Sequence, residues 1–218
     1  LAALEAGVAH QETKVNCSGM IEFGDSRFHC WKKDGHGWLN MIDAIEQSCD
    51  VYLYELAKRV GIKRIGEMAA RFGFGEAFNF GLPGENRGLI PTPAWKRKTF
   101  GQAWHAGETL ITSIGQGFIL CTPLQLAVMT SRLVNGGRPV LPRLMKNERA
   151  EIQKRKSLQL SPQHLHTVLK GMDKVVNGSQ GTARKVVDQD TKFQFGGKSG
   201  SVQVKRISLD ERESGKLK

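Results

Sequence analysis

The chain has 218 residues, 39% of them hydrophobic, which is enough for one domain with a core of its own. Lys and Arg total 32 against 21 Asp and Glu, and the net charge of +11 fits either an anionic partner or only a solvated basic surface. No five consecutive residues are Lys or Arg and no run of 18 residues is apolar, so neither a nucleic-acid surface nor a membrane span is predicted.

The first third of the chain is predicted to be a loop followed by helices. Residues 1–6 read as helical and end at Gly7. Residues 10–37 show no periodicity, which predicts an irregular loop that needs more than apolar burial to hold it. Residues 38–60 carry apolar side chains at spacings of three and four, typical of one helix or of two helices meeting at a corner at residues 48–50. Gly61 is the predicted stop, and a further helix follows it.

The remaining two thirds alternate between loops and well-signalled helices. Residues 76–117 are rich in Gly and Pro and are predicted to be extended loops. Residues 122–134 begin with Thr-Pro and a Gln at the capping-box position, the clearest helix start in the chain. Residues 161–177 form the next predicted helix. Residues 193–204 alternate around glycines, which predicts an interrupted strand open to close approach by a ligand.

The glycine-interrupted strand contains Lys198, Ser199, Gly200 and Ser201. An ammonium beside hydroxyls can bind a carboxylate, and a glycine lets an extended substrate lie against the strand. Such a tetrapeptide is also common in exposed turns, so it carries weight only together with other residues.

A second short motif, Ser48-Cys49-Asp50, lies at the predicted helix corner, where Ser48 could pass protons and Asp50 could hold a lysine or an amide. Penicillin-recognising serine enzymes use the set S-x-x-K, S-D-N and K-T-G. Ser48-Cys49-Asp50 resembles the second motif with Asp for Asn, and Lys198-Ser199-Gly200 resembles the third with Ser for Thr, about 150 residues later. The stretches that accompany these motifs carry the same resemblance, at 35–40, 91–96, 113–117 and 122–125.

On these residues the chain resembles the class B penicillin-binding proteins, and most closely their penicillin-binding protein 2 branch. The resemblance implies an α/β penicillin-recognising (β-lactamase-like) fold, with a helical subdomain and an incomplete antiparallel sheet over residues 1–218. It implies a peptidoglycan D,D-transpeptidase that cross-links stem peptides during cell-wall elongation through an acyl-enzyme and is inhibited by β-lactams. It also implies a place at the periplasmic face of the bacterial inner membrane, with cell-elongation membrane proteins as partners.

The resemblance assigns roles to six residues: catalysis to Ser48, Asp50 and Lys198, and substrate binding to Ser199, Gly200 and Ser201. One departure from the family pattern is serious, because no Ser-x-x-Lys occurs anywhere in the sequence. The chain is therefore expected to begin just after that motif and to end before the last strands of the sheet. By itself it is expected to be unable to form an acyl-enzyme.

Three cysteines and a histidine fall within one stretch of the chain. Cys17, Cys30, His36 and Cys49 are separated by 12, 5 and 12 residues, and three thiolates with an imidazole complete a tetrahedral zinc shell. The resemblance implies a structural zinc at His36 and Cys49, with Cys30 and Cys17 where some relatives have Asp. One zinc ion is therefore predicted to stabilise residues 10–50, a Cys17–Cys30 disulfide is the alternative, and Cys121 is expected to be buried elsewhere.

Two other functions remain open from the sequence. One is a D,D-carboxypeptidase or β-lactamase of the same fold, which rapid antibiotic turnover would distinguish. The other is a non-catalytic binding module stabilised by zinc, which fits a chain without a nucleophile.

Overall fold

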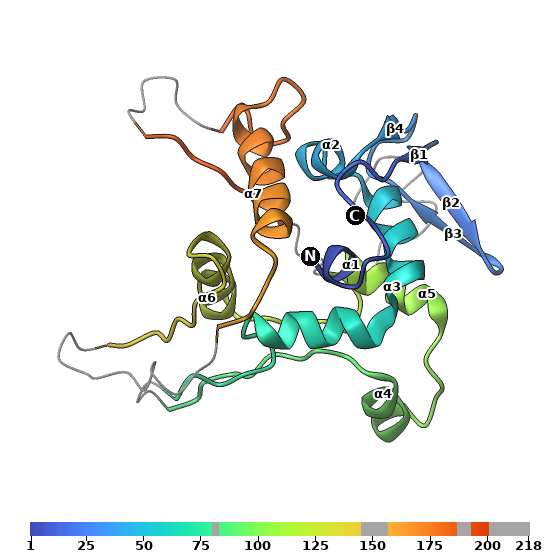
Figure 1. The fold of residues 1–218 in the computed structure, drawn as a ribbon. Helices are drawn as coiled ribbons and strands as arrows, with labels where there is room; N and C mark the ends of the chain where they lie inside the picture. Colours follow the sequence, from blue (N-terminus) through green and yellow to red (C-terminus); the bar gives the residue numbers. More distant parts are fainter. Residues whose placement is uncertain (80–82, 145–156, 187–192, 201–218) are drawn as a thin grey trace.

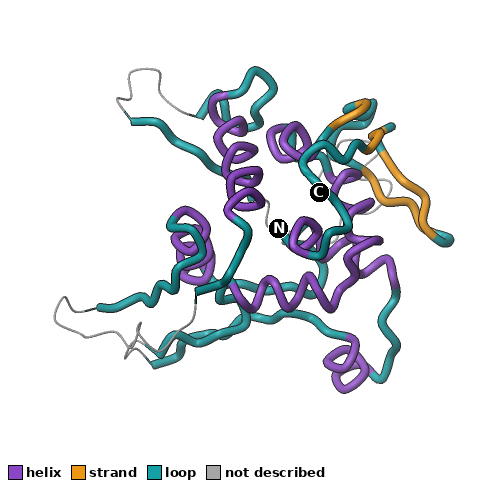
Figure 2. Tube along the Cα trace, in the orientation of Figure 1, coloured by secondary structure: helices purple, strands orange, loops and turns teal. Residues whose placement is uncertain are grey.

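The computed structural model describes residues 1–79, 83–144, 157–186 and 193–200, and it contains far more helix than strand, joined by long loops (Figure 2). None of the described helices is both long and apolar enough to cross a bilayer. In chain order the elements are α1 (Ala2–Glu5), β1 (Val15–Cys17), β2 (Met20–Phe23), β3 (Ser26–His29), β4 (Gly37–Leu39), α2 (Met41–Glu46), α3 (Asp50–Arg71), α4 (Pro93–Phe100), α5 (Ala106–Ser113), α6 (Pro123–Val134) and α7 (Pro162–Asn177).

The main core forms where α1, α2, α3 and α5 meet the N-terminal strands. Its most buried side chains include Val51, Tyr52 and Leu110, each at most 1% exposed. Figure 1 shows the four strands gathered on one side of α3, while α7 packs on α2. A second, smaller core joins Phe72 at the end of α3 to Leu133 of α6 and Leu165 of α7. As a result, α2 and the start of α3 lie between the strands and α7.

Several predicted elements are confirmed, because local capping signals decided them. Thr122 and Gln125 form the capping box of α6, and Pro162 opens α7. The two-helix reading of residues 38–60 is right, since α2 ends and α3 begins on either side of a corner at 47–49. Gly61 breaks the helical backbone inside α3 with φ 77° and ψ 158°.

Two of the predicted loops contain regular structure instead. Residues 10–37 hold two antiparallel pairs, β1 with β4 and β2 with β3. Strands of three or four residues are too short for a pattern of alternation to stand out. Residues 76–117 contain α4 and α5, and α4 repeats the Thr-Pro start seen at α6, with Thr92 accepting from the Trp95 amide.

The predicted strand around Lys198 is not formed in residues 193–200, the part of it that the structure describes. Those residues lie along α7 instead, where the Gly197 amide donates to the Met172 carbonyl at 2.9 Å and the Asn177 side-chain amide donates to the Phe195 carbonyl at 2.9 Å. A strand needs a hydrogen-bonded neighbour, and the paired strands that the structure describes lie within residues 15–39, with one isolated antiparallel bridge between Leu89 and Leu120. The rest of the predicted strand, residues 201–204, falls outside the described residues.

The close packing of α7 on α2 predicts a sensitive position at Gly171. A Cβ there would approach Ile45 of α2 to 2.8–2.9 Å, so Gly171→Ala must push the helices apart. We expect a loss of about 1–3 kcal/mol in stability, the usual cost of overpacking, and a lower melting temperature by circular dichroism. Lys170→Ala, at the neighbouring exposed position, is the control and should stay within about 0.5 kcal/mol of the wild type. Equal melting temperatures for the two variants would contradict this packing.

Candidate functional site

The corner between α2 and α3 places Ser48 in a conformation that serine rarely adopts. Helix α2 ends with the Cys49 amide donating to the Ala44 carbonyl at 2.9 Å, and Ser48 takes φ 54° at the position that usually holds glycine. A left-handed backbone costs a residue with a Cβ roughly 1–2 kcal/mol. Such strain at a polar residue is typical of functional sites.

The Ser48 side chain meets the second predicted motif. The Lys198 ammonium donates to Ser48 Oγ at 2.6 Å, although the two residues are 150 positions apart in the chain. Ser199 Oγ lies 3.5 Å from Ser48 Oγ and accepts from Lys198 Nζ at 3.2 Å. The structure therefore brings both motifs into one constellation of a cation and two hydroxyls.

The structure adds a third hydroxyl to this constellation, that of Thr182, which the sequence did not reveal. Thr182 Oγ1 lies 3.2 Å from Ser48 Oγ, and the Thr182 amide donates to the Glu46 carbonyl at the end of α2. Thr182 belongs to no recognised motif. The only signals near it are Gly178 and Gly181, where a Cβ would collide with Glu46 and with the Val175 carbonyl respectively.

Asp50 and Lys198 are electrostatically linked across the corner. Burial raises the pKa of Asp50 to about 6, against the opposing effects of the Trp31 amide and the Lys198 charge. Desolvation lowers the pKa of Lys198, and Asp50 opposes that shift. A lysine that gives up its proton more readily, beside two hydroxyls, can pass protons or bind a carboxylate.

Of the two other predicted substrate-binding residues, the structure describes Gly200. A Cβ on Gly200 would meet nothing within 4 Å, so the backbone there is open to an approaching ligand. Ser201 lies outside the described residues.

Beside the corner, the four residues singled out as metal ligands converge. The three thiol sulfurs and a ring nitrogen of Cys17, Cys30, His36 and Cys49 all lie within 4.8 Å of one another. The three cysteines are at most 3% exposed, and all are free thiols. Cys121, expected to be buried, is exposed instead, because the Leu120-Cys121 segment before α6 stays at the surface.

The distances within this sulfur cluster suit a tetrahedral metal. His36 Nδ1 lies 3.5 Å from Cys17 Sγ and 3.6 Å from Cys30 Sγ. Zinc–sulfur and zinc–nitrogen bonds of about 2.3 and 2.0 Å at a tetrahedral angle separate S and N by roughly 3.5 Å. The donor set and its spacing therefore fit one four-coordinate zinc ion with no open position.

The local backbone explains how residues so far apart in sequence meet. Antiparallel pairing sets Cys17 opposite Gly37, and the His36 amide donates to the Cys17 carbonyl at 3.0 Å. Gly35 must be glycine, since a Cβ there would collide with that carbonyl. Cys49 enters from the other side as the N-cap of α3, where its sulfur accepts from the Tyr52 amide at 3.4 Å.

The thiols of Cys30 and Cys49 influence each other strongly. A hydrogen bond from Cys49 lowers the pKa of Cys30 to about 4, and the same bond together with burial raises the pKa of Cys49. One thiolate is thus favoured in the cluster before any ion binds, and thiolates are the form that ligates metals.

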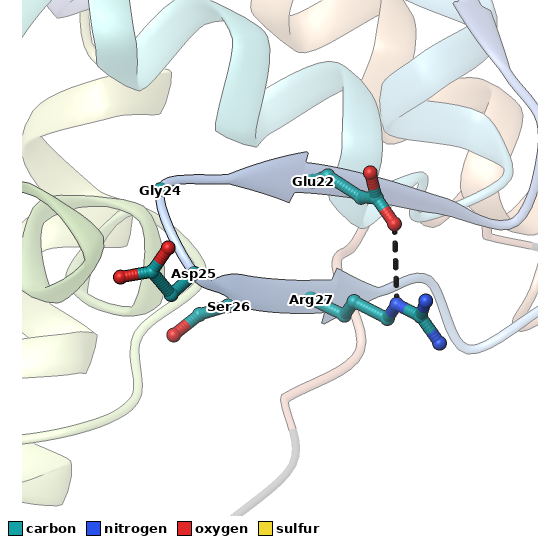
Figure 3. Close-up of a pocket in the computed structure, with 5 residues that line it drawn as sticks. All are labelled: Glu22, Gly24, Asp25, Ser26 and Arg27. Atoms are coloured by element: carbon teal, nitrogen blue, oxygen red, sulfur yellow. Dashed lines mark hydrogen bonds and ion pairs between the residues drawn. The ribbon is translucent and has the colours of Figure 1, made fainter.

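An open pocket of about 210 Å³ lies elsewhere, at the turn of the β2–β3 hairpin (Figure 3). Its lining includes Glu22 and Arg27, whose side chains form an exposed ion pair at 3.2 Å. An exposed pair of this kind contributes little, and the lining includes neither Ser48 nor Lys198, so this pocket is not the candidate site.

Known proteins match this chain over nearly its whole length. The family model of the penicillin binding protein transpeptidase domain covers residues 1–215. A peptidoglycan D,D-transpeptidase MrdA of Acinetobacter baumannii is 34% identical over 97% of this chain and 32% of its own length. Penicillin-binding protein 2 of Pseudomonas aeruginosa, solved with WCK 5153, is 40% identical with a TM-score of 0.80 over 85% of this chain and 42% of that one.

A second solved structure extends the likeness. Penicillin-binding protein 2 of Helicobacter pylori, in complex with MreC, is 35% identical with a TM-score of 0.85 over 93% of this chain and 37% of that one. This likeness confirms the predicted transpeptidase fold. The chain spans about a third of the length of the curated relatives it matches. From the family match over residues 1–215, the chain belongs to the penicillin-binding protein transpeptidase domain family.

Proposed function

We propose that this chain forms part of a peptidoglycan D,D-transpeptidase that cross-links stem peptides during cell-wall elongation. The observation that carries the proposal is the 2.6 Å contact from Lys198 to Ser48, which joins the two recognised motifs at one point. Relatives named as peptidoglycan D,D-transpeptidases support it. The full-length protein is expected to supply the acylating serine and its lysine, since this sequence contains no Ser-x-x-Lys.

In this proposal each group of the constellation has a task. Lys198 and Ser199 bind the terminal carboxylate of the stem peptide by charge and hydrogen bond. Ser48, which accepts from Lys198 in the free site, passes a proton to the departing D-Ala. The Asp50 carboxylate balances the positive charge of Lys198. β-Lactams, whose carboxylate and acyl group resemble the end of that peptide, are expected to acylate the same site.

Acylation by benzylpenicillin tests this function. The full-length protein should gain the mass of one intact penicillin, slowly released, when followed by mass spectrometry. Lys198→Ala should lower the acylation rate about 10²–10³-fold, the usual cost of removing one donor aimed at developing or bound charge. Lys63→Ala, an exposed lysine on α3, is the matched control and should acylate like the wild type.

Two results would overturn the proposal. Absence of any adduct on the full-length protein would favour the non-catalytic binding module. Rapid hydrolysis of penicillin with turnover would favour a β-lactamase of the same fold.

We also propose that Cys17, Cys30, His36 and Cys49 hold one structural zinc ion. Support comes from the convergence of four ligand atoms within 4.8 Å, the free thiols, and sulfur–nitrogen distances that suit tetrahedral coordination. A bound ion would join the β1–β4 segment to the first turn of α3 and thereby hold the corner that carries Ser48. It would fix geometry only, because all four positions belong to the protein.

The expected cellular location follows from the proposed activity. Peptidoglycan cross-linking takes place outside the inner membrane, so we expect the full-length protein at the periplasmic face of that membrane. The complex of a Helicobacter pylori relative with MreC supports a membrane-associated elongation protein as partner.

A further inference from the structure

Trp31 connects the sulfur cluster to the catalytic corner. It follows Cys30 directly, and its ring meets His36 edge to face, with centroids 5.4 Å apart. It is 58% exposed, yet both its main-chain amide and its indole N–H have partners. Its amide donates to the Asp50 carboxylate at 2.9 Å, and its indole N–H is shared between the carbonyls of Gln47 and Ser48 at 3.1 and 3.0 Å.

The indole of Trp31 donates to main-chain carbonyls that neither α2 nor α3 can pair. The carbonyls of Gln47 and Ser48 lie after α2 has ended and before α3 has begun, so the helical ladders cannot use them. The Glu46 carbonyl just before them accepts from the Thr182 amide. Trp31 thus supplies the donor for both corner carbonyls on either side of the left-handed Ser48 backbone.

Fixing these two carbonyls fixes the Cβ of Ser48, from which its hydroxyl projects. A carbonyl and the next residue's amide form one rigid plane. Holding the planes before and after Ser48 therefore sets both backbone torsions of that residue, including its strained φ of 54°. Ser48 Oγ then points to Lys198, and the bond from the Trp31 amide holds Asp50 on the same side.

We infer that Trp31 is a positioning residue for the transpeptidase reaction, which holds the Ser48 backbone in its productive conformation through the indole N–H. The inference rests on the proposed function. Trp31 does not touch the reacting atoms; it acts through Ser48 and Asp50. Cys30 directly precedes Trp31, and Cys49 directly follows Ser48, so Trp31 is a second connection between the sulfur cluster and the Ser48 hydroxyl, beside the chain itself at Cys49.

The test compares Trp31→Phe with Trp38→Phe in the full-length protein. Phenylalanine keeps an aromatic ring beside His36 and the backbone donor to Asp50 but lacks the indole N–H. Trp38 lies on β4 in the same segment and is 70% exposed, so it controls for loss of a tryptophan. Stopped-flow acylation by a fluorescent penicillin gives the non-covalent dissociation constant and the acylation rate constant separately, while metal analysis gives the zinc content.

Trp31→Phe is expected to keep its zinc content and its dissociation constant while its acylation rate constant falls about tenfold, the effect of roughly one hydrogen bond. Trp31→His, whose five-membered ring can also present an N–H, should recover part of the rate. Trp38→Phe should match the wild type. A merely structural role would move zinc content or melting temperature instead.

Two results would overturn the inference alone: equal acylation rate constants in Trp31→Phe and wild type, or a fall that is explained wholly by lost zinc. If wild-type protein forms no penicillin adduct, the proposed function fails and takes this inference with it. The wild-type measurement therefore separates the two failures.

Discussion

Cys30→Ala is expected to leave the purified protein without zinc and to lower its melting temperature more than Gly171→Ala does. Structural zinc contributes on the order of 10 kcal/mol to the folding of small zinc domains, and a tetrahedral site with three ligands loses most of that affinity. Loss of a metal is among the few single changes that cost about 4 kcal/mol or more. Cys30 is 3% exposed inside the cluster, so water cannot easily replace its sulfur.

Metal analysis and thermal unfolding with and without a chelator check this result. The wild type should contain one zinc per chain and lose stability in chelator, whereas Cys30→Ala should contain none and ignore the chelator. Cys121→Ala is the matched control, since Cys121 is an exposed thiol outside the cluster, and it should behave like the wild type. A zinc-free wild type with a Cys17–Cys30 disulfide in its peptide map would show that the cluster is an oxidised pair.

Secondary structure could be predicted from the sequence where residues close in the chain determine it. The capping box at Thr122 announced α6, because a capping side chain acts on amides within its own turn. Pro162 at the first helical position announced α7, although its N-cap Ser161 makes no side-chain capping bond. Helix α4 was missed although Thr92 caps it in the same manner. Its middle reads Lys96-Arg97-Lys98, and its only buried side chain is that of Lys96, so the apolar spacing that marks most helices is missing.

The candidate site was predictable in its residue types but not in its connections. Ser48 and Lys198 were found because both motifs are short and the family pattern orders them. Trp31 and Thr182 were missed because each is a single residue that reaches the α2–α3 corner from a distant part of the chain, and such contacts leave no pattern in the sequence. The candidate metal ligands were singled out by residue type together with the family resemblance, while their convergence depends on the β1–β4 pairing that was not predicted.

Replacing Ser48 should separate catalysis from stability. Both Ser48→Ala and Ser48→Gly remove the hydroxyl that accepts from Lys198, so both should lower the acylation rate constant by about 10²–10⁴-fold, the usual contribution of a proton-transferring group. Only Ser48→Gly relieves the left-handed backbone at φ 54°. We therefore expect Ser48→Gly to be about 1 kcal/mol more stable than Ser48→Ala, despite the greater freedom of glycine in the unfolded chain.

Neither Ser48 variant has the hydroxyl, so their difference in stability reports the strain of the left-handed corner, less the entropy that glycine loses on folding. Acylation by fluorescent penicillin and melting temperature, measured on the same zinc-loaded samples, should show two equally slow proteins of unequal stability. If Ser48→Gly acylates at the wild-type rate, the hydroxyl has no part in the chemistry. If instead the two variants melt together, the left-handed corner is not strained, and the reason for a serine where glycine would fit better must lie elsewhere. Either way, the backbone strain at residue 48 is measured apart from the proton transfer by its hydroxyl.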